Sequence, residues 1–291
     1  MKPARFQYYD PETVDEVLRL LAEHGEEAKI LAGGQSLVPL MNFRLARPSS
    51  LIDINRVSSL AYLKQENGAL RIGSLTRQRA VEKSELVLRQ NPLVVEASEH
   101  IGQPAIRNRG SVGGSLAHAD PAAEWPALAV AMDATMIVRS AQAERTVPAS
   151  EFFVTYLTTC MAPDEMLAEV RMPCLPPGSG WSFLELSRRH GDFALVGVAL
   201  WLTADAGGVC TGGAIALTGV GPSPVRARKA EERLRGERLG QTLFQQVAAA
   251  VSEELEPDSD LHASADYRRR VGGVLTRRAL AIAQTRLGRN G

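Results

Sequence analysis

The chain has 291 residues, of which 45% are hydrophobic and 23% charged, and its formal net charge is zero. A chain of this length buries a sizeable core and usually forms two or three domains. Zero net charge favours neither nucleic acid nor an anionic membrane as a partner. The N-terminal stretch has no apolar signal segment, and the longest apolar run, "ALVGVALWL", is far shorter than the roughly 20 residues that cross a bilayer. We therefore expect a cytoplasmic protein without membrane insertion.

The stretch "DPETVDEVLRLLAEHG" near the N-terminus predicts a helix. We expect Asp10 to be its N-cap, Pro11 its first residue and Gly25 its C-terminal stop. The segments "AKIL", "SLIDI" and "ALRIGSL" that follow are typical of short buried strands. Residues 1–75 are therefore predicted to form a compact α/β unit.

The middle of the chain begins with helical pattern over residues 77–102, broken near Pro92. Residues 103–125 have no period of either kind and are rich in Gly, Asn, His, Asp and Pro, which predicts a long functional loop. A helix over 122–132 and a strand over 135–140 follow.

The Pro- and Gly-rich stretch "MPCLPPGSG", residues 172–180, is the predicted domain boundary. Three strand-like segments come after it, "WSFLELSRR", "ALVGVALWLTAD" and "CTGGAIALTGV", and then three helical ones. Strands followed by helices favour an antiparallel sheet with helices on one face.

Two Gly-Gly segments stand where periodic structure stops, "AGGQS" at 32–36 and "SVGGS" at 111–115. Glycines let several backbone N–H groups approach a pyrophosphate, and Ser36, Ser111 and Ser115 add hydroxyl donors. A plain turn is the better explanation of one such segment alone, but two of similar composition fit a phosphate clamp built from two loops.

Charged residues accompany the second segment. Arg107 and Arg109, on either side of Asn108, suit phosphate recognition, although surface arginines are mostly solvated. Asp120 and Glu124 are candidates to accept hydrogen bonds from ribose or adenine. The alternatives are that Asp120 N-caps the helix over 122–132 and that Glu124 compensates its dipole.

Metal ligation is not indicated, because Cys160, Cys174 and Cys210 are widely spaced and no C-x-x-C is present. His118 is expected to be a hydrogen-bonded structural histidine. The segment "TGVGPSP", residues 218–224, is interpreted as a structural turn. The arginines of the last helix, beginning with Arg268, are expected on a solvated or subunit-facing surface and not at nucleic acid.

Taken together, "AGGQSLVPLMNFRLARPSSLIDI", "IRNRGSVGGSLAHADPAAEWPAL" and "LSRRHGDFALVGVAL" resemble the FAD-binding medium subunit of molybdenum hydroxylases. This group includes bacterial carbon monoxide, nicotine and caffeine dehydrogenases and the flavin portion of xanthine dehydrogenase. The resemblance implies an α+β chain. Residues 1–176 would form a two-lobed FAD-binding domain of the PCMH (vanillyl-alcohol-oxidase-like) type, with lobes at roughly 1–57 and 58–176. Residues 177–291 would form the C-terminal sheet-and-helix domain.

The resemblance also implies a set of FAD-binding residues and no catalytic or metal-binding residue on this chain. The first loop and its flanks would wrap the pyrophosphate, the second would complete the cradle, Glu124 would face the adenosine end, and a loop by the isoalloxazine would carry Phe193 where some relatives have tyrosine. The full set is Ile30, Leu31, Ala32, Gly33, Gly34, Gln35, Ser36, Leu37, Ile101, Gly102, Ser111, Val112, Gly113, Gly114, Ser115, Glu124, Leu167, Asp192 and Phe193.

The implied function is electron transfer within a complex. FAD on this chain would receive electrons from a small subunit with [2Fe-2S] clusters and pass them to an external acceptor. A large molybdopterin subunit would oxidise the substrate, and the complex is expected to be a dimer of heterotrimers. The alternatives are a stand-alone FAD-dependent oxidase or dehydrogenase, and a binding or assembly protein that has lost the flavin.

Overall fold

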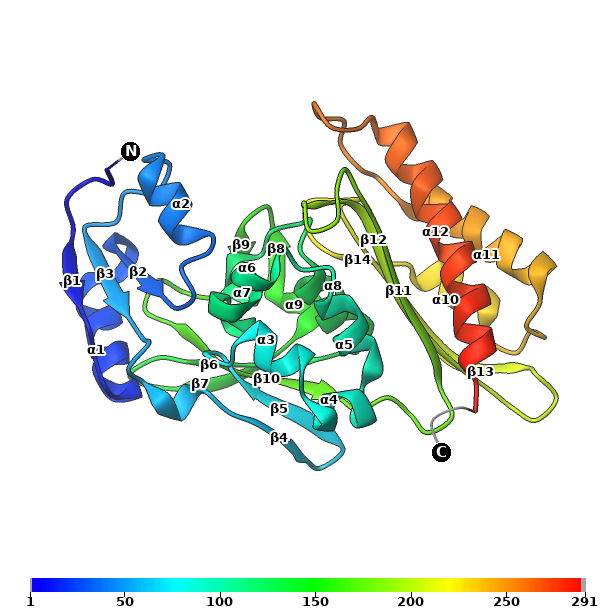
Figure 1. The fold of residues 1–291 in the computed structure, drawn as a ribbon, viewed down its shortest axis with the longest axis horizontal. Coiled ribbons are helices and arrows are strands. Elements are labelled where there is room, and N and C mark those ends of the chain that lie inside the picture. Colours follow the sequence, from blue (N-terminus) through cyan, green and yellow to red (C-terminus); the bar gives the residue numbers. More distant parts are fainter. Residues whose placement is uncertain (1, 289–291) are drawn as a thin grey trace.

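The computed structural model describes residues 2–288 and begins with a small α/β lobe (Figure 1). Its sheet has the order β1-β3-β2, with both neighbours parallel to β3. Buried side chains of helix α1, among them Val17 and Leu21, pack on Ile52 of β3. The elements of this first lobe are β1 (Gln7–Tyr9), α1 (Val14–His24), η1 (Gly25–Glu27), β2 (Ala28–Leu31), α2 (Leu37–Asn42), β3 (Ser50–Asp53) and η2 (Ser58–Leu60).

Helix α1 is capped differently from the prediction. Its N-cap is Thr13, whose hydroxyl accepts from the Glu16 N–H at 3.2 Å, while the Glu16 carboxylate accepts from the Thr13 N–H. This capping box satisfies two N-terminal amides and fixes the start of the helix at Val14. Asp10 lies upstream of that start and is therefore not the N-cap. Gly25 ends the helix with a positive φ of 52°, as predicted.

Replacing Thr13 with alanine is expected to lower the free energy of unfolding by about 1 kcal/mol, since an N-cap hydroxyl is lost. Urea denaturation of the purified chain measures this difference. An unchanged midpoint would show that the capping box contributes nothing to stability.

The second lobe is built on a five-stranded antiparallel sheet of order β4-β5-β10-β6-β7. The prediction of one unit over residues 1–75 is wrong, since β5 pairs with β10 in this second sheet and not with the first-lobe strands. Two strands that lie this far apart in the chain pair only in the folded protein, so the local sequence does not predict their pairing. The strands are β4 (Leu63–Glu66), β5 (Ala69–Gly73), β6 (Thr135–Arg139), β7 (Glu144–Pro148) and β10 (Met166–Pro173), and the hairpin β8 (Phe153–Thr155) and β9 (Thr158–Thr159) stands beside them.

Short helices cover this sheet around a core that includes Leu70, Trp125 and Leu128. The predicted loop 103–125 contains two of them, α6 and α7. Helices of six or seven residues are too short to show a period, although Pro104 at a first helical position and Ser111 as an N-cap mark their starts. The helices are α3 (Gln78–Glu82), α4 (Glu85–Gln90), α5 (Pro92–Ser98), α6 (Pro104–Arg109), α7 (Val112–His118), α8 (Glu124–Ala131) and α9 (Ala149–Phe152).

The C-terminal domain matches the predicted antiparallel sheet with helices on one face (Figure 1). Its strand order is β11-β12-β13-β14. The other face packs on the second lobe, where Phe183 joins the core and the Trp201 indole donates to the Ala131 carbonyl at 2.9 Å. The elements are β11 (Gly180–Ser187), β12 (Ala194–Ala204), β13 (Cys210–Thr218), β14 (Val225–Arg226), α10 (Arg228–Leu234), α11 (Gln241–Glu254) and α12 (Ala265–Arg286).

In the region the structure describes, no helix is both long and apolar enough to cross a membrane.

Candidate functional site

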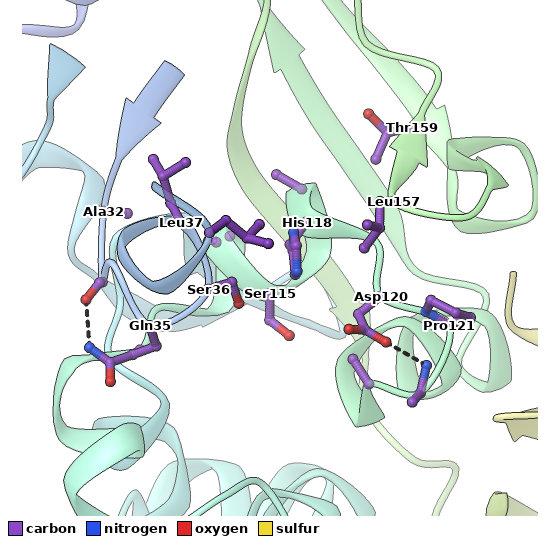
Figure 2. Close-up of a pocket in the computed structure, with 18 of the residues that line it drawn as sticks. Ala32, Gln35, Ser36, Leu37, Ser115, His118, Asp120, Pro121, Leu157 and Thr159 are labelled. Atoms are coloured by element: carbon purple, nitrogen blue, oxygen red, sulfur yellow. Dashed lines mark hydrogen bonds between the residues drawn. The ribbon is translucent and has the colours of Figure 1, made fainter. Parts of the chain in front are cut away.

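A cleft of about 1540 Å³ runs between the two lobes and reaches the C-terminal domain. Figure 2 shows Gln35 and Ser36 of the first lobe and Ser115, His118 and Asp120 of the second, all of which line it. The structure brings most of the predicted residues to its wall. They are Ile30, Ala32, Gly33, Gly34, Gln35, Ser36, Leu37, Ile101, Gly102, Ser111, Gly113, Gly114, Ser115, Glu124, Leu167, Asp192 and Phe193.

Two predicted residues do not line the cleft. Val112 is fully buried in the core of the second lobe. Leu31 is the last residue of β2. Its Cδ1 is 3.2 Å from where a Cβ on Gly34 would be, so its side chain packs against the glycine turn.

The glycines of the two segments serve the protein's own packing. A Cβ on Gly33 would lie 2.4 Å from the Arg109 carbonyl oxygen, and one on Gly113 would lie 2.3 Å from the Ser74 Cβ. Gly34 has a φ of 72°, which L-residues rarely adopt. The first segment therefore sits directly against the second, and their contact joins the two lobes at the cleft.

The two segments differ in the backbone donors they offer. In the second, the N–H groups of Val112 and Gly113 donate to Thr76 and Ser74 carbonyls at 2.9 Å, and those of Gly114 and Ser115 donate to Ser111. In the first, the N–H groups of residues 33–36 donate to no acceptor among the described residues. Backbone amides without an internal acceptor that lie beside a cleft are available to an anion, whereas the amides of the second segment are used within the protein.

Neither predicted arginine lines the cleft. Arg107 is buried, where it donates to the Glu82 carboxylate at 2.7 Å and to the carbonyls of Ile101 and Gly102 at 2.8 Å. It is neither solvated nor a phosphate ligand, and instead it fixes the cleft-lining Ile101-Gly102 turn. The role of Arg109 lies in its backbone: its carbonyl oxygen accepts a hydrogen bond from the Arg77 guanidinium.

Asp120 is not the N-cap of α8. Its carboxylate accepts from the Ala122 N–H at 2.9 Å, and the helix starts at Glu124 without a side-chain cap (Figure 2). Asp120 therefore forms a local turn over residues 120–122, before the helix begins at Glu124. Glu124 does lie in the first turn, but it is only 7% exposed and lines the cleft.

Burial raises the pKa of Glu124 to about 7, with repulsion from Asp120 adding to it and Arg107 opposing it. A second carboxyl group lies nearby on β11: burial and the charge of Glu124 raise the pKa of Glu185 to about 8. The buried Glu185 Oε2 has no hydrogen-bond partner in the described chain. Glu185 is not among the predicted site residues, although it shares a strand face with buried Phe183 two residues earlier.

Further cleft residues also differ from expectation. Arg268 is buried, not solvated, and donates to the carbonyls of Leu195 and Gly219 and to Asp260. The segment 218–224 forms the connection between β13 and β14, and its Gly219 and Gly221 line the cleft. The His118 imidazole makes no hydrogen bond to the described residues, so it is not the hydrogen-bonded histidine that was predicted, and burial lowers its pKa. No group of three or more potential metal-ligating side chains occurs over residues 2–288.

The loop before β12 carries Phe193, which is 73% exposed at the cleft. The Gln103 side chain donates to the His190 carbonyl at 3.1 Å, and Gly191 lies close to the Gly102 carbonyl. This contact ties the loop to the second lobe. Two lobes that meet at a long cleft with unpaired loop amides, closed on one side by the C-terminal domain, are suited to an elongated, phosphate-containing cofactor.

Comparison with known proteins identifies the family. A model described as "FAD binding domain in molybdopterin dehydrogenase" matches residues 4–175, and one described as "CO dehydrogenase flavoprotein C-terminal domain" matches residues 181–283. The chain therefore belongs to the family of FAD-binding medium subunits of molybdenum hydroxylases. It is an oxidoreductase subunit with FAD as its cofactor, and its fold is the predicted PCMH type with a C-terminal flavoprotein domain.

Relatives match along almost the whole chain. The chain is 44% identical to 6-hydroxypseudooxynicotine dehydrogenase complex subunit alpha of Paenarthrobacter nicotinovorans, over 97% of this chain and 96% of that one. The structure of carbon monoxide dehydrogenase from Hydrogenophaga pseudoflava is similar, with a TM-score of 0.96 at 38% identity over 99% of this chain and 100% of that chain. Quinoline 2-oxidoreductase from Pseudomonas putida 86 gives 0.93 at 36% identity, over 98% and 99%.

Proposed function

We propose that this chain is the electron-transfer subunit of a heteromeric molybdenum hydroxylase. It accepts electrons from a [2Fe-2S] subunit and passes them to an external acceptor, while a large molybdopterin subunit oxidises the substrate. The complex is a cytoplasmic dimer of heterotrimers. The substrate is an N-heterocycle or another small organic molecule, because relatives include a quinoline oxidoreductase and a dehydrogenase of a nicotine-like compound.

One observation carries this proposal: loops from two lobes meet at a single long cleft whose first loop has unpaired amides. FAD is an elongated cofactor with a pyrophosphate at its middle, and these amides fit that group. Ser36 and Ser115 add hydroxyl donors at the same place.

Other residues of the cleft would bind and shield the rest of the cofactor. Glu124 would accept from a hydroxyl or amino group at the adenosine end. Ile101, Gly102 and Leu167 would contact it through apolar surface, and Asp192 and Phe193 would lie at the ring end. Bound FAD supplies two-electron and one-electron redox chemistry; the protein supplies orientation, electrostatics and access.

The test compares the purified chain with the assembled complex. The full chain alone is expected to retain FAD and to turn over no organic substrate. In complex with the large and small subunits, its flavin is expected to be reduced when substrate is added. A flavin that stays oxidised while the iron–sulfur clusters are reduced would contradict the electron-transfer role.

The alternative is a stand-alone FAD-dependent oxidase or dehydrogenase. Turnover of an organic substrate by the isolated chain would favour it. A chain that remains colourless after incubation with FAD would instead favour a binding or assembly protein without flavin.

A further inference from the structure

We propose that Arg77 and Asn55 are positioning residues that hold the two halves of the FAD pyrophosphate cradle together without touching the cofactor. This inference rests on the proposed location of the FAD site. Neither residue lines the cleft, so both would act through the backbone of the two segments that do.

The contacts begin at the first segment. The Asn55 side-chain amide donates to the Ala32 carbonyl at 2.9 Å, directly before the glycine pair. Asp53 holds Asn55 in place, because its carboxylate accepts from both the backbone N–H and the side-chain amide of Asn55. With its amide nitrogen used in this way, Asn55 presents its oxygen to the second lobe.

Arg77 completes the connection from the other lobe. One guanidinium nitrogen donates to the Asn55 side-chain oxygen at 2.5 Å, and another donates to the Arg109 carbonyl at 2.6 Å. Its own backbone forms a bridge with Ser111, and the neighbouring Gln78 N–H donates to the Gly110 carbonyl. Arg77 is therefore anchored in the second segment and reaches across to the first.

The acceptor that Arg77 holds is the same atom that Gly33 approaches. A Cβ on Gly33 would lie 2.4 Å from the Arg109 carbonyl oxygen, so the glycine and the guanidinium meet at one carbonyl. This geometry leaves the spacing of the two segments little freedom while the hydrogen bonds persist. Arg77 reaches its two acceptors with two separate nitrogens of a rigid plane, and the single ammonium nitrogen of lysine cannot reproduce that spacing.

The experiment measures the dissociation constant of FAD by flavin fluorescence on the full chain. Arg77→Gln and Asn55→Ala are each expected to weaken binding about tenfold, as loss of a charge-assisted hydrogen bond predicts. The double variant is expected to be no weaker than the weaker single, because both residues act through one connection. Arg77→Lys is expected to recover less than half of the loss on a logarithmic scale.

The control is Arg89→Gln, which makes the same chemical change at an exposed ion pair with Glu85 and is expected to leave binding unchanged. Urea unfolding of the FAD-free variants separates the positioning role from a merely structural one, which would lower stability but not the affinity of the folded chain. If Arg77→Gln fails to fold, Asn55→Ala decides alone.

Wild-type affinity in a folded single variant, or losses that multiply in the double variant, would overturn the positioning role. A wild-type chain that binds no FAD would contradict the proposed site itself.

Discussion

A Gly33→Ala chain is expected to bind FAD roughly 100-fold more weakly than the wild type, because an added methyl group overpacks the contact between the two segments. The Cβ would meet the Arg109 carbonyl oxygen at 2.4 Å and the Gly110 Cα at 2.8 Å. Both are backbone atoms, so a rotamer change cannot relieve the overlap. The first segment must move away from the second, and its unpaired amides then lose their placement at the pyrophosphate.

The matched control is Gly240→Ala, where nothing lies within 4 Å of the added Cβ and φ is extended at 175°. Equilibrium titration with FAD should leave this control at wild-type affinity. Wild-type affinity in Gly33→Ala as well would show that the contact between the segments does not set the cradle.

Sequence patterns located the cleft because glycines, serines and the absence of periodicity are local features. They did not reveal why the glycines are needed. Gly33 is a glycine because Arg109, far along the chain, comes within contact of it, and only the folded chain brings the two together. The sequence therefore picks out a segment that lines the cleft, while the constraint on Gly33 comes from the protein's own packing.

Charged residues were the least predictable part of the site. Arg107 and Arg268 read as surface or phosphate-binding arginines, yet both are buried and hold backbone carbonyls of cleft-lining turns. Their partners lie on other elements, so no local spacing predicts the pairing. The two misplaced helix caps have local causes. At α1, Thr13 takes the N-cap in place of Asp10, and at α8 the Asp120 carboxylate is used by the Ala122 N–H, so the helix begins without a side-chain cap.

A Glu185→Gln chain without FAD is expected to gain stability over the wild type as pH rises, by on the order of 2 kcal/mol between pH 5 and pH 9. Burial and the charge of Glu124 raise the pKa of Glu185 to about 8, and burial raises that of Glu124 to about 7. Both values exceed the value of about 4.3 for an unfolded glutamate. The figure of 2 kcal/mol is below the full linkage value because Glu185 is only partly buried.

The direction of this change in stability with pH follows from proton binding. A group whose pKa is raised in the folded state binds protons more tightly there, so the folded state is penalised once the unfolded chain ionises. The penalty is absent below about pH 4, grows toward pH 8 and stays constant above it. Glutamine removes this contribution at nearly the same volume, and it also relieves the repulsion on Glu124. The remaining charged groups that act on Glu124 are Asp120 and Arg107.

Urea denaturation at a series of pH values measures the difference, with exposed Glu232→Gln on α10 as the control that should show no trend. A Glu185→Gln difference that is flat from pH 5 to pH 9 would mean that Glu185 ionises in the folded chain without penalty. Because Glu124 lines the cleft, a pH trend is also expected in FAD affinity, since an ionised Glu185 behind it repels the charge of Glu124. That trend should disappear in Glu185→Gln, which links the buried pair to the cofactor.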